Sequence, residues 1–425
     1  MRTDEQQGNT MKILWVKAGK ILPVDAGGKI RTYNILRHLQ ERHQLVLLST
    51  YGGRRDPWYE SEIKKQFPGS LPVWTAAPDS NTLARLFHYL YCFPSGLPFA
   101  IRKFTDRAAG KKIEQLIQQE KFDAVVCDFL APSLTFPARL WGQTILFQHN
   151  VETMLWDRML ASEPNRLRKL LYGVEAGRMR RYECSSIAKF QHVIAVSEQD
   201  RAYMSQFMPA EKISVVPTGV DLDQYRPVSG GQANEPLVVF TGTMNFEPNM
   251  DGVEYFCREI WPRVLKAVPN ARFRIVGKEP VASVRRLASE TAEVTGTVPS
   301  VVEHVKQAWV LVVPLRMGGG TRLKIYEGMA MGRAVVSTTI GAEGLEVRNG
   351  KDIVLADEAD TFADAVITLL RDSELRKRYE RAAAETVTRF GWASVAAKFV
   401  EVLAAAVSAK SSNTARSLPV DAVRR

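Results

Sequence analysis

The residues best suited to chemistry lie between Pro314 and Leu345, in the run PLRMGGGTRLKIYEGMAMGRAVVSTTIGAEGL. Three glycines, Gly318 to Gly320, separate an apolar segment from a helical pattern. Such a junction offers backbone N–H groups and the positive end of a helix dipole to an anion. Three cationic side chains would add formal charge there: Arg316, Arg322 and Lys324. Glu327 lies too far into the helix to complement a phosphate, so we expect it to accept hydrogen bonds from sugar hydroxyls. The stretch predicts a nucleotide-sugar site, although the same residues also fit a capped helix whose charges are only solvated.

The elements that position this stretch are a strand, a loop, a helix and a second strand. Residues 308–313 form an apolar run with the length of a buried strand. Thr321 is the expected N-cap of a helix in which apolar side chains recur from Leu323 until Gly332, and a second apolar strand covers 334–337. This order of elements is typical of a parallel α/β sheet.

The run GGGTRLKIYEGMAMGRAVVST, followed by GAEGL, resembles the donor-binding signature of glycosyltransferase family 4. The resemblance implies the α/β fold called GT-B, in which two Rossmann-like domains with parallel sheets face a central cleft. It also implies that Glu327 holds the nucleotide ribose. The residues around the glycines are expected to line the donor site: Gly318, Gly319, Gly320, Thr321 and Leu323. The family carries a further glutamate where this chain has Gly319, and backbone N–H groups of the glycine loop are the expected replacement.

Two segments of the N-terminal half resemble the same family more weakly. Gly27 and Gly28 lie in PVDAGGKIR, between an apolar strand and a helix expected at 32–39, and the resemblance puts them near the donor phosphates and the acceptor. His149 lies in HNVE, after the apolar strand 144–147, and the resemblance puts it beside the transferred sugar. It would hydrogen-bond that sugar or handle the acceptor proton near neutral pH. A tight turn and a structural histidine are the plainer alternatives.

Length and composition restrict the class of protein. A chain of 425 residues exceeds one ordinary core, so we expect two domains. Its 45% hydrophobic and 24% charged residues are typical of a soluble globular protein. We find neither a signal peptide nor an apolar run long enough to span a membrane, and we expect a cytoplasmic protein. The four cysteines lack metal-ligand spacing, which favours free thiols: Cys92, Cys127, Cys184 and Cys257.

The formal net charge of +11 predicts an anionic partner. Nucleic acid, an anionic membrane and phosphorylated substrates all fit, but no nucleic-acid-binding motif favours the first. Residues 83–117 mix aromatic and basic side chains. They fit either a helix lying on an anionic membrane or a core-packing face with a basic rim, and we prefer the second unless the acceptor is lipid-linked.

The expected domain organisation follows from the order of these segments. Residues 11–228 would form the acceptor-binding domain and end in the crossover PTGVDLDQYRP, a pattern typical of the same family. Residues 229–391 would form the donor-binding domain. The last helix, 392–407, would pack back on the N-terminal domain, and the tail, 408–425, is expected to be disordered.

The sequence as a whole predicts a retaining glycosyltransferase that moves a sugar from a UDP- or GDP-sugar to a saccharide or lipid-linked acceptor in polysaccharide or glycolipid biosynthesis. The expected catalytic residues are His149, Arg322 and Lys324, and Gly242, after the strand 237–241, is a further expected donor contact. The cationic side chains and the helix N-terminus can stabilise a departing diphosphate, and we expect neither metal nor cofactor. Two other functions stay open. One is a catalytically weak nucleotide-sugar-binding protein. The other is a nicotinamide-dependent oxidoreductase, although the dinucleotide fingerprint is lacking.

Overall fold

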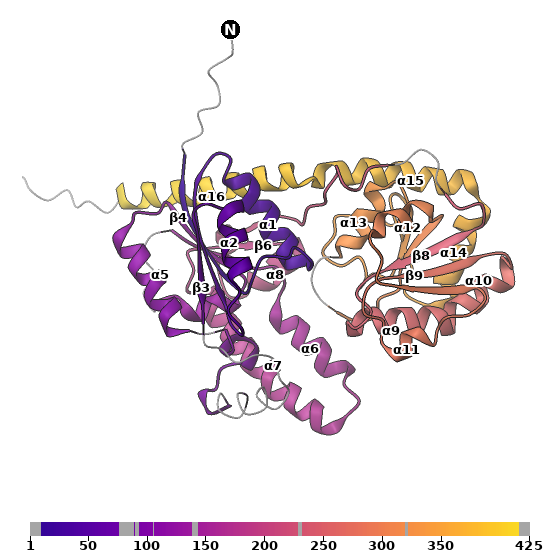
Figure 1. The fold of residues 1–425 in the computed structure, drawn as a ribbon, viewed down its shortest axis with the longest axis horizontal. Coiled ribbons are helices and arrows are strands. Elements are labelled where there is room, and N and C mark those ends of the chain that lie inside the picture. Colours follow the sequence, from indigo (N-terminus) through magenta and orange to yellow (C-terminus); the bar gives the residue numbers. More distant parts are fainter. Residues whose placement is uncertain are drawn as a thin grey trace, which may run out of the picture. The chain divides into compact units, whose positions relative to one another are not determined.

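The computed structural model describes residues 10–75, 89, 93–104, 106–137, 143–227, 232–318 and 322–415. The chain forms two compact α/β units (Figure 1). Unit 1 consists of Met1–Val216 with Ala396–Arg425, and unit 2 is Pro217–Val395. The crossover after Val216, which we expected in the N-terminal domain, groups with unit 2, where Val220 forms a β-bridge with Gly391.

Unit 1 contains a seven-stranded parallel sheet in the order β3-β2-β1-β4-β5-β6-β7. Its strands are β1 (Lys12–Ala18), β2 (Gln44–Tyr51), β3 (Ser70–Trp74), β4 (Ala124–Asp128), β5 (Thr144–Phe147), β6 (His192–Ala195) and β7 (Ile213–Val215). Most are apolar runs, as expected for strands that are covered on both faces. The strand order reverses between β1 and β4, where Lys17 pairs with Asp128. In open α/β sheets, ligands bind outside the carboxyl ends of the strands at such a reversal.

Two helices of unit 1 differ from the prediction, one in where it begins and the other in where it ends. They are α1 (Gly27–Leu39), α2 (Pro57–Gln66), α4 (Phe99–Arg102), α5 (Arg107–Gln119), α6 (Glu152–Ser162), α7 (Arg166–Ile187), α8 (Glu198–Met204) and the main part of α16 (Trp392–Ala415). Helix α1 begins before Thr32, so that Gly27 and Gly28 form its first turn. Helix α16 continues past residue 407 into the segment expected to be disordered, and its Phe399 packs 5.4 Å from Trp15, between ring centroids.

Unit 2 contains a six-stranded parallel sheet in the order β10-β9-β8-β11-β12-β13. Its strands are β8 (Leu237–Thr241), β9 (Arg272–Val276), β10 (Ala292–Gly296), β11 (Val310–Val313), β12 (Ala334–Ser337) and β13 (Val354–Leu355). Its helices are α9 (Glu247–Tyr255), α10 (Trp261–Ala267), α11 (Ala282–Arg285), α12 (Val301–Gln307), α13 (Leu323–Ala330), α14 (Ala359–Arg371) and α15 (Ser373–Val387). The predicted strand, helix and strand around the glycine loop are thus confirmed as β11, α13 and β12.

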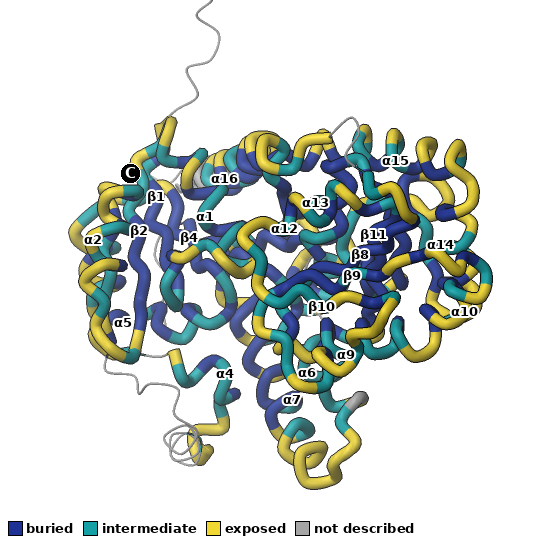
Figure 2. The backbone as a smooth tube through the Cα atoms, turned by 45° about the vertical axis from the view of Figure 1, so that its right-hand side comes forward, coloured by how far each residue is buried: buried dark blue, intermediate teal, exposed yellow. Residues whose placement is uncertain are grey.

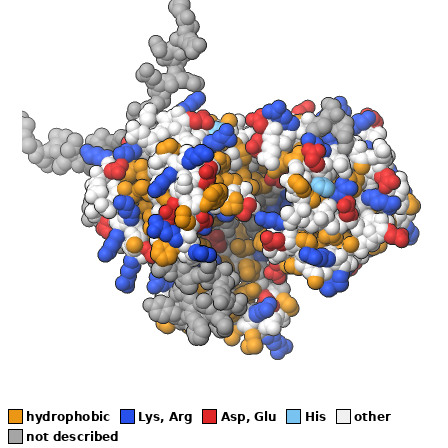
Figure 3. Space-filling model, viewed as in Figure 1, with side chains coloured by type: hydrophobic (Ala, Val, Ile, Leu, Met, Phe, Trp, Pro, Cys, Tyr) orange, Lys and Arg blue, Asp and Glu red, His pale blue; other side chains and the backbone are white. Residues whose placement is uncertain are grey.

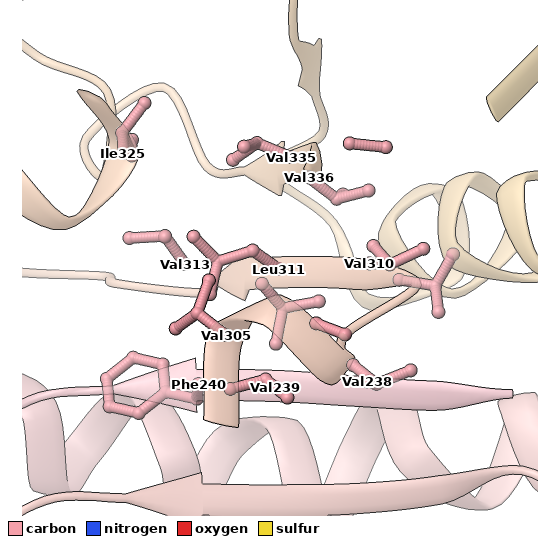
Figure 4. Close-up of a cluster of buried hydrophobic side chains, with 14 of the residues drawn as sticks. Val238, Val239, Phe240, Val305, Val310, Leu311, Val313, Ile325, Val335 and Val336 are labelled. Atoms are coloured by element: carbon pink, nitrogen blue, oxygen red, sulfur yellow. The ribbon is translucent and has the colours of Figure 1, made fainter. Parts of the chain in front are cut away.

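The core of unit 2 explains where α13 lies. Val310, Leu311 and Val313 of β11 pack among apolar side chains from β8, β12, α12 and α13 (Figure 4). A Cβ atom on Gly328 would lie 2.4 Å from Leu311 Cδ2, so a larger residue there would displace Leu311 or move α13 away from β11. Close packing of α13 against this strand fixes its first turn at the carboxyl end of the sheet.

Burial follows the sheets in both units (Figure 2). The strands are mostly buried, and the helices expose one side to solvent. Three cysteines in the described part are free thiols, as predicted, and Cys92 lies outside it. No helix within the described residues is both long and apolar enough to cross a membrane.

Candidate functional site

The first candidate site lies at the carboxyl ends of β1, β4 and β5 in unit 1. Asp128, the last residue of β4, is fully buried. Its Oδ2 accepts hydrogen bonds from Lys17 Nζ (3.1 Å), Thr32 Oγ1 (2.7 Å) and Trp15 Nε1 (3.0 Å). Its Oδ1 lies 2.7 Å from His149 Nε2. Side chains from β1, from α1 and from the loop after β5 thus converge on one carboxylate.

The protonation states of this site follow from its burial and charges. Burial alone would raise the pKa of Asp128, but Lys17 and His149 hold it well below its usual range. Burial lowers the pKa of His149 to about 3, and the adjacent Asp128 carboxylate offsets this effect only in part. His149 is therefore neutral near neutral pH, and the short separation between its Nε2 and Oδ1 of Asp128 favours the tautomer that carries the proton on Nε2.

The second ring nitrogen of His149 is then an acceptor. This Nδ1 is buried and has no hydrogen-bond partner in the described part of the chain. An imidazole with so low a pKa is poorly suited to take up an acceptor proton. Of the two roles that the sequence left open for His149, the geometry favours the hydrogen bond to a sugar hydroxyl.

The N-terminus of α1 approaches His149 because residue 28 has no side chain. A Cβ atom on Gly28 would lie 2.7 Å from the Phe129 ring and 3.8 Å from His149 Nδ1. Phe129 has a left-handed backbone (φ 75°) and stacks on His149 with ring centroids 3.8 Å apart. Helix α1 has no side-chain cap and no acidic residue in its first turn. The structure therefore brings Gly28 and His149 together beside a helix end that suits an oxygen ligand.

Glu183 of α7 fixes the segment on either side of His149. Its buried carboxylate accepts hydrogen bonds from Gln148 Nε2 (2.8 Å) and from the backbone N–H groups of Glu152 (2.8 Å) and Thr153 (2.9 Å). The last two groups open α6 and need partners outside that helix. Burial raises the pKa of Glu183, and burial with repulsion from Glu183 raises the pKa of Glu152 to about 7. The sequence offers no local signal for this role, because Glu183 lies in a long basic helix and its nearest partner is 30 positions away.

We predict that Glu183→Gln lowers the free energy of unfolding by about 1–3 kcal/mol, since an amide in that position turns one of the three accepted hydrogen bonds into a clash of donors. Glu175→Gln is the matched control, because Glu175 is also buried in α7 but accepts from Phe99 N (2.7 Å). Urea unfolding should show a loss in both variants. The imidazole signals of His149 in NMR spectra should move only in Glu183→Gln; unchanged signals there would refute the positioning role.

The second candidate site lies in unit 2, at the carboxyl ends of β8 and β11, where the strand order again reverses. Gly242 follows β8, and Lys324 lies in the first turn of α13. Lys324 Nζ donates to Asn249 Oδ1 (2.9 Å) and lies 4.2 Å from the centroid of the Phe240 ring. A Cβ atom on Gly242 would be 3.0 Å from that Nζ. The ammonium group thus borders the backbone of the loop between β8 and α9.

The pKa of the Lys324 ammonium group is lowered toward neutral pH. Burial lowers its pKa to about 7; repulsion from Arg322 adds to this effect, and Glu327 opposes it. Arg322 is itself only 6% exposed. Two neighbouring cations in a poorly solvated position favour an anion that would restore the charge of the lysine. The pair is therefore suited to a diphosphate.

Glu327 lies one turn further along α13. Tyr225, from the crossover segment, lies next to its carboxylate, and burial together with this carboxylate raises the pKa of the tyrosine. Burial raises the pKa of Glu327, although Tyr225 and Lys324 act in the opposite direction. A carboxylate oriented by a tyrosine and next to a cation is a suitable acceptor for vicinal hydroxyls, as expected for a ribose site.

The other predicted donor residues are not all gathered here. Arg316 pairs with Asp251 (Nε to Oδ2, 3.0 Å) and stacks on Tyr255, so a local carboxylate already compensates its charge. Gly318 has a left-handed backbone (φ 115°), and a Cβ atom there would lie 2.8 Å from the guanidinium of Arg322. Leu323 opens α13. Three further predictions lie outside the described residues: Gly319, Gly320 and Thr321. Within the described residues, no group of His, Cys, Asp or Glu side chains could hold a metal ion.

The topology of the two units is that of GT-B proteins. Residues 26–224 match the family model described as Glycosyltransferase Family 4, and residues 235–372 match the model described as Glycosyl transferases group 1. The chain belongs to family 4 of the glycosyltransferases, enzymes that use nucleotide-sugar donors.

Named relatives and a solved structure agree with this assignment. A phosphatidyl-myo-inositol mannosyltransferase of Mycolicibacterium smegmatis is 26% identical over 69% of this chain and 74% of that protein. An uncharacterized 44.6 kDa protein in the cps region of Klebsiella pneumoniae is 21% identical over 84% of this chain and 90% of that protein. Anabaena HepE, solved in complex with UDP-glucose, has the same fold, with a TM-score of 0.63, 15% identity and coverage of 93% and 100% of the two chains.

Proposed function

We propose that this protein transfers a sugar, with retention of anomeric configuration, from a nucleotide diphosphate sugar to an acceptor hydroxyl without a metal ion. The observation that carries the proposal is the position of Lys324 beside Arg322 and the backbone of Gly242, at the strand-order reversal of unit 2. A diphosphate bound there would leave as an anion stabilised by two cations and the N-terminal end of α13.

The remaining residues receive roles consistent with this reaction. Glu327 would hold the ribose. His149, neutral and with Nδ1 as an acceptor, would hydrogen-bond a hydroxyl of the transferred sugar, and Asp128 would keep it in that tautomer. A relative that acts on phosphatidyl-myo-inositol supports a lipid-linked acceptor, and one encoded in a cps region supports a saccharide.

A calorimetric screen against UDP, GDP, ADP and NADH, with and without magnesium, tests the donor site. We expect saturable binding of one nucleoside diphosphate, independent of magnesium, and its loss in the combined Arg322→Ala and Lys324→Ala variant.

Glu327→Gln should weaken the same binding by about five- to tenfold through one lost hydroxyl contact. Binding of NADH alone would overturn the proposal. Tight donor binding with no transfer to glycolipid or saccharide acceptors would favour a nucleotide-sugar-binding protein instead.

A further inference from the structure

The hairpin of α6 and α7 ends in exposed leucines. Four apolar residues in the first half of α7 form what we call the apolar strip: Leu167, Leu170, Leu171 and Val174. Their exposed fractions are 80%, 70%, 40% and 38%. They are spaced by three or four positions and therefore share one side of the helix. Single exposed apolar residues need no explanation, but a contiguous strip marks an interaction surface.

Basic side chains interleave with the apolar strip. Arg166, Arg168 and Lys169 are exposed, and within the described residues none of them forms an ion pair. The nearby acidic residues are already engaged, since Asp157 pairs with Arg180 (2.7 Å) and Glu163 accepts from the backbone N–H of Asn165 (2.9 Å). Figure 3 shows blue and orange side chains together at the lower end of the molecule. The surface therefore offers hydrophobic contact together with uncompensated positive charge.

The hairpin is built to present this surface rigidly. The rings of Trp156 and Tyr172 meet edge to face with centroids 6.0 Å apart, and thus hold α6 against α7. Asn165 caps α7 by accepting from the backbone N–H groups of residues 167 and 168. Further along α7, Glu175 accepts a hydrogen bond from the backbone N–H of Phe99 (2.7 Å) and Arg178 donates one to the carbonyl of Phe93 (2.9 Å), so these two side chains tie the helix to the rest of unit 1. No rearrangement is needed to expose the leucines, so little ordering entropy would be lost on docking.

We propose that the tip of the α6–α7 hairpin docks on an anionic membrane surface, with the leucines at the level of the headgroups and the three cations on acidic lipids. An amphipathic helix with leucines on one side and Lys or Arg around them is the arrangement that binds such interfaces, and each basic residue near the surface strengthens the attraction. Charge complementarity selects an acidic lipid surface over a neutral protein partner. The proposal goes beyond the proposed transfer reaction and does not depend on it.

This surface differs from the segment in which the sequence suggested membrane contact. In the described part of 83–117, Ile101 and Ile113 are buried in the core of unit 1. These two isoleucines therefore serve packing, and Phe93 and Phe104 of the same segment are partly exposed. The strip on α7, in contrast, exposes four apolar side chains on one side of a single helix. The remainder of the segment lies partly outside the described residues.

Flotation of the full chain with vesicles tests the proposal. Vesicles of phosphatidylcholine with phosphatidylglycerol should bind the protein, and vesicles of phosphatidylcholine alone should not.

Neutralising all three cations (Arg166→Gln, Arg168→Gln, Lys169→Gln) should reduce binding roughly 100-fold, at about fivefold per charge. Leu167→Ser with Leu170→Ser should reduce it about tenfold. Added salt should weaken the wild type and leave the neutralised variant nearly unaffected.

Matched controls keep the test specific. Trp58→Ser with Lys64→Gln and Lys65→Gln alters exposed residues of α2 and should bind vesicles like the wild type. All variants should keep the wild-type unfolding midpoint and nucleotide affinity, which separates a docking defect from misfolding or a lost donor site. Equal binding by wild type and both hairpin variants would refute the proposal. A different outcome would overturn the membrane assignment. If the wild type formed a dimer in sedimentation experiments but did not bind vesicles, and the leucine variant were monomeric, the apolar strip would be the contact to a second copy of the chain.

Discussion

Lys324→Met should weaken the binding of a nucleotide sugar by about 10- to 100-fold in slightly acid buffer. The methionine keeps the length and apolar contacts of the side chain over Phe240 but removes the charge that borders Gly242 and Asn249. A charge-assisted hydrogen bond to a phosphate contributes about 1.5–3 kcal/mol, which corresponds to that range of affinity. Titration calorimetry with UDP-glucose and GDP-mannose as probes measures the effect for whichever one binds the wild type.

The same lysine predicts a pH dependence of donor binding. The pKa of Lys324 is about 7 in the free protein, and a bound diphosphate raises it. Above that pH the free protein holds fewer protons than the complex, so binding takes up a proton and affinity falls as pH rises. Below that pH the lysine is already charged and affinity levels off. Calorimetry in buffers of different ionisation enthalpy should show an uptake approaching about one proton at mildly alkaline pH.

Lys324→Arg is the control for this titration, because a guanidinium stays protonated throughout the window. Its affinity should be independent of pH between the neutral and mildly alkaline range, whatever its absolute value. If wild type and Lys324→Arg show the same fall in affinity with pH, another group titrates and the role given to Lys324 is wrong.

The glycine-loop region was predictable because its signals are local. An apolar run, a glycine turn and helical spacing lie within about thirty consecutive residues, and each limits the structure by itself. The predicted bounds of β11, α13 and β12 therefore match closely. Arg316 shows the limit of this reasoning. Its spacing put it with the donor-site cations, but its partner Asp251 lies 65 positions away, where no local pattern points to it.

The site of unit 1 was only partly predictable, because its partners meet through the sheet. His149 was expected from its place after a strand, but Lys17 reads as an ordinary residue in an apolar run. Its role arises from the parallel register that sets it opposite Asp128. Similarly, helix α1 begins at Gly27, before Thr32, and its first turn lies against Phe129, about 100 positions away in sequence, where Gly28 leaves no room for a side chain. Glycine pairs suggest turns locally, and tertiary packing overrides that preference here.

Asp128→Asn should lower the free energy of unfolding by about 3–5 kcal/mol, because it leaves the ammonium of Lys17 buried without its counter-charge. The substitution also acts on His149. An asparagine that keeps accepting from Thr32 and Trp15 points its amide N–H₂ at Nε2 of the imidazole. That nitrogen must then accept, so the proton moves to Nδ1. The nitrogen that we propose as the acceptor for a substrate hydroxyl then becomes a donor. We expect turnover to fall roughly 10- to 100-fold, with a smaller loss of affinity for the donor, whose sugar His149 would contact.

The double variant Lys17→Met, Asp128→Asn separates the two effects. Without the lysine, the ammonium that Asp128→Asn leaves unpaired is gone, and replacing a whole buried ion pair by neutral groups of similar size costs little stability. Urea unfolding should therefore return close to the wild-type midpoint. Turnover should stay low, because the amide introduced at position 128 still holds the imidazole in the reversed tautomer. Recovery of both stability and turnover would mean that the ion pair alone matters and that Nδ1 of His149 does not contact the sugar. Recovery of stability alone would tie the reaction to the tautomer that Asp128 selects.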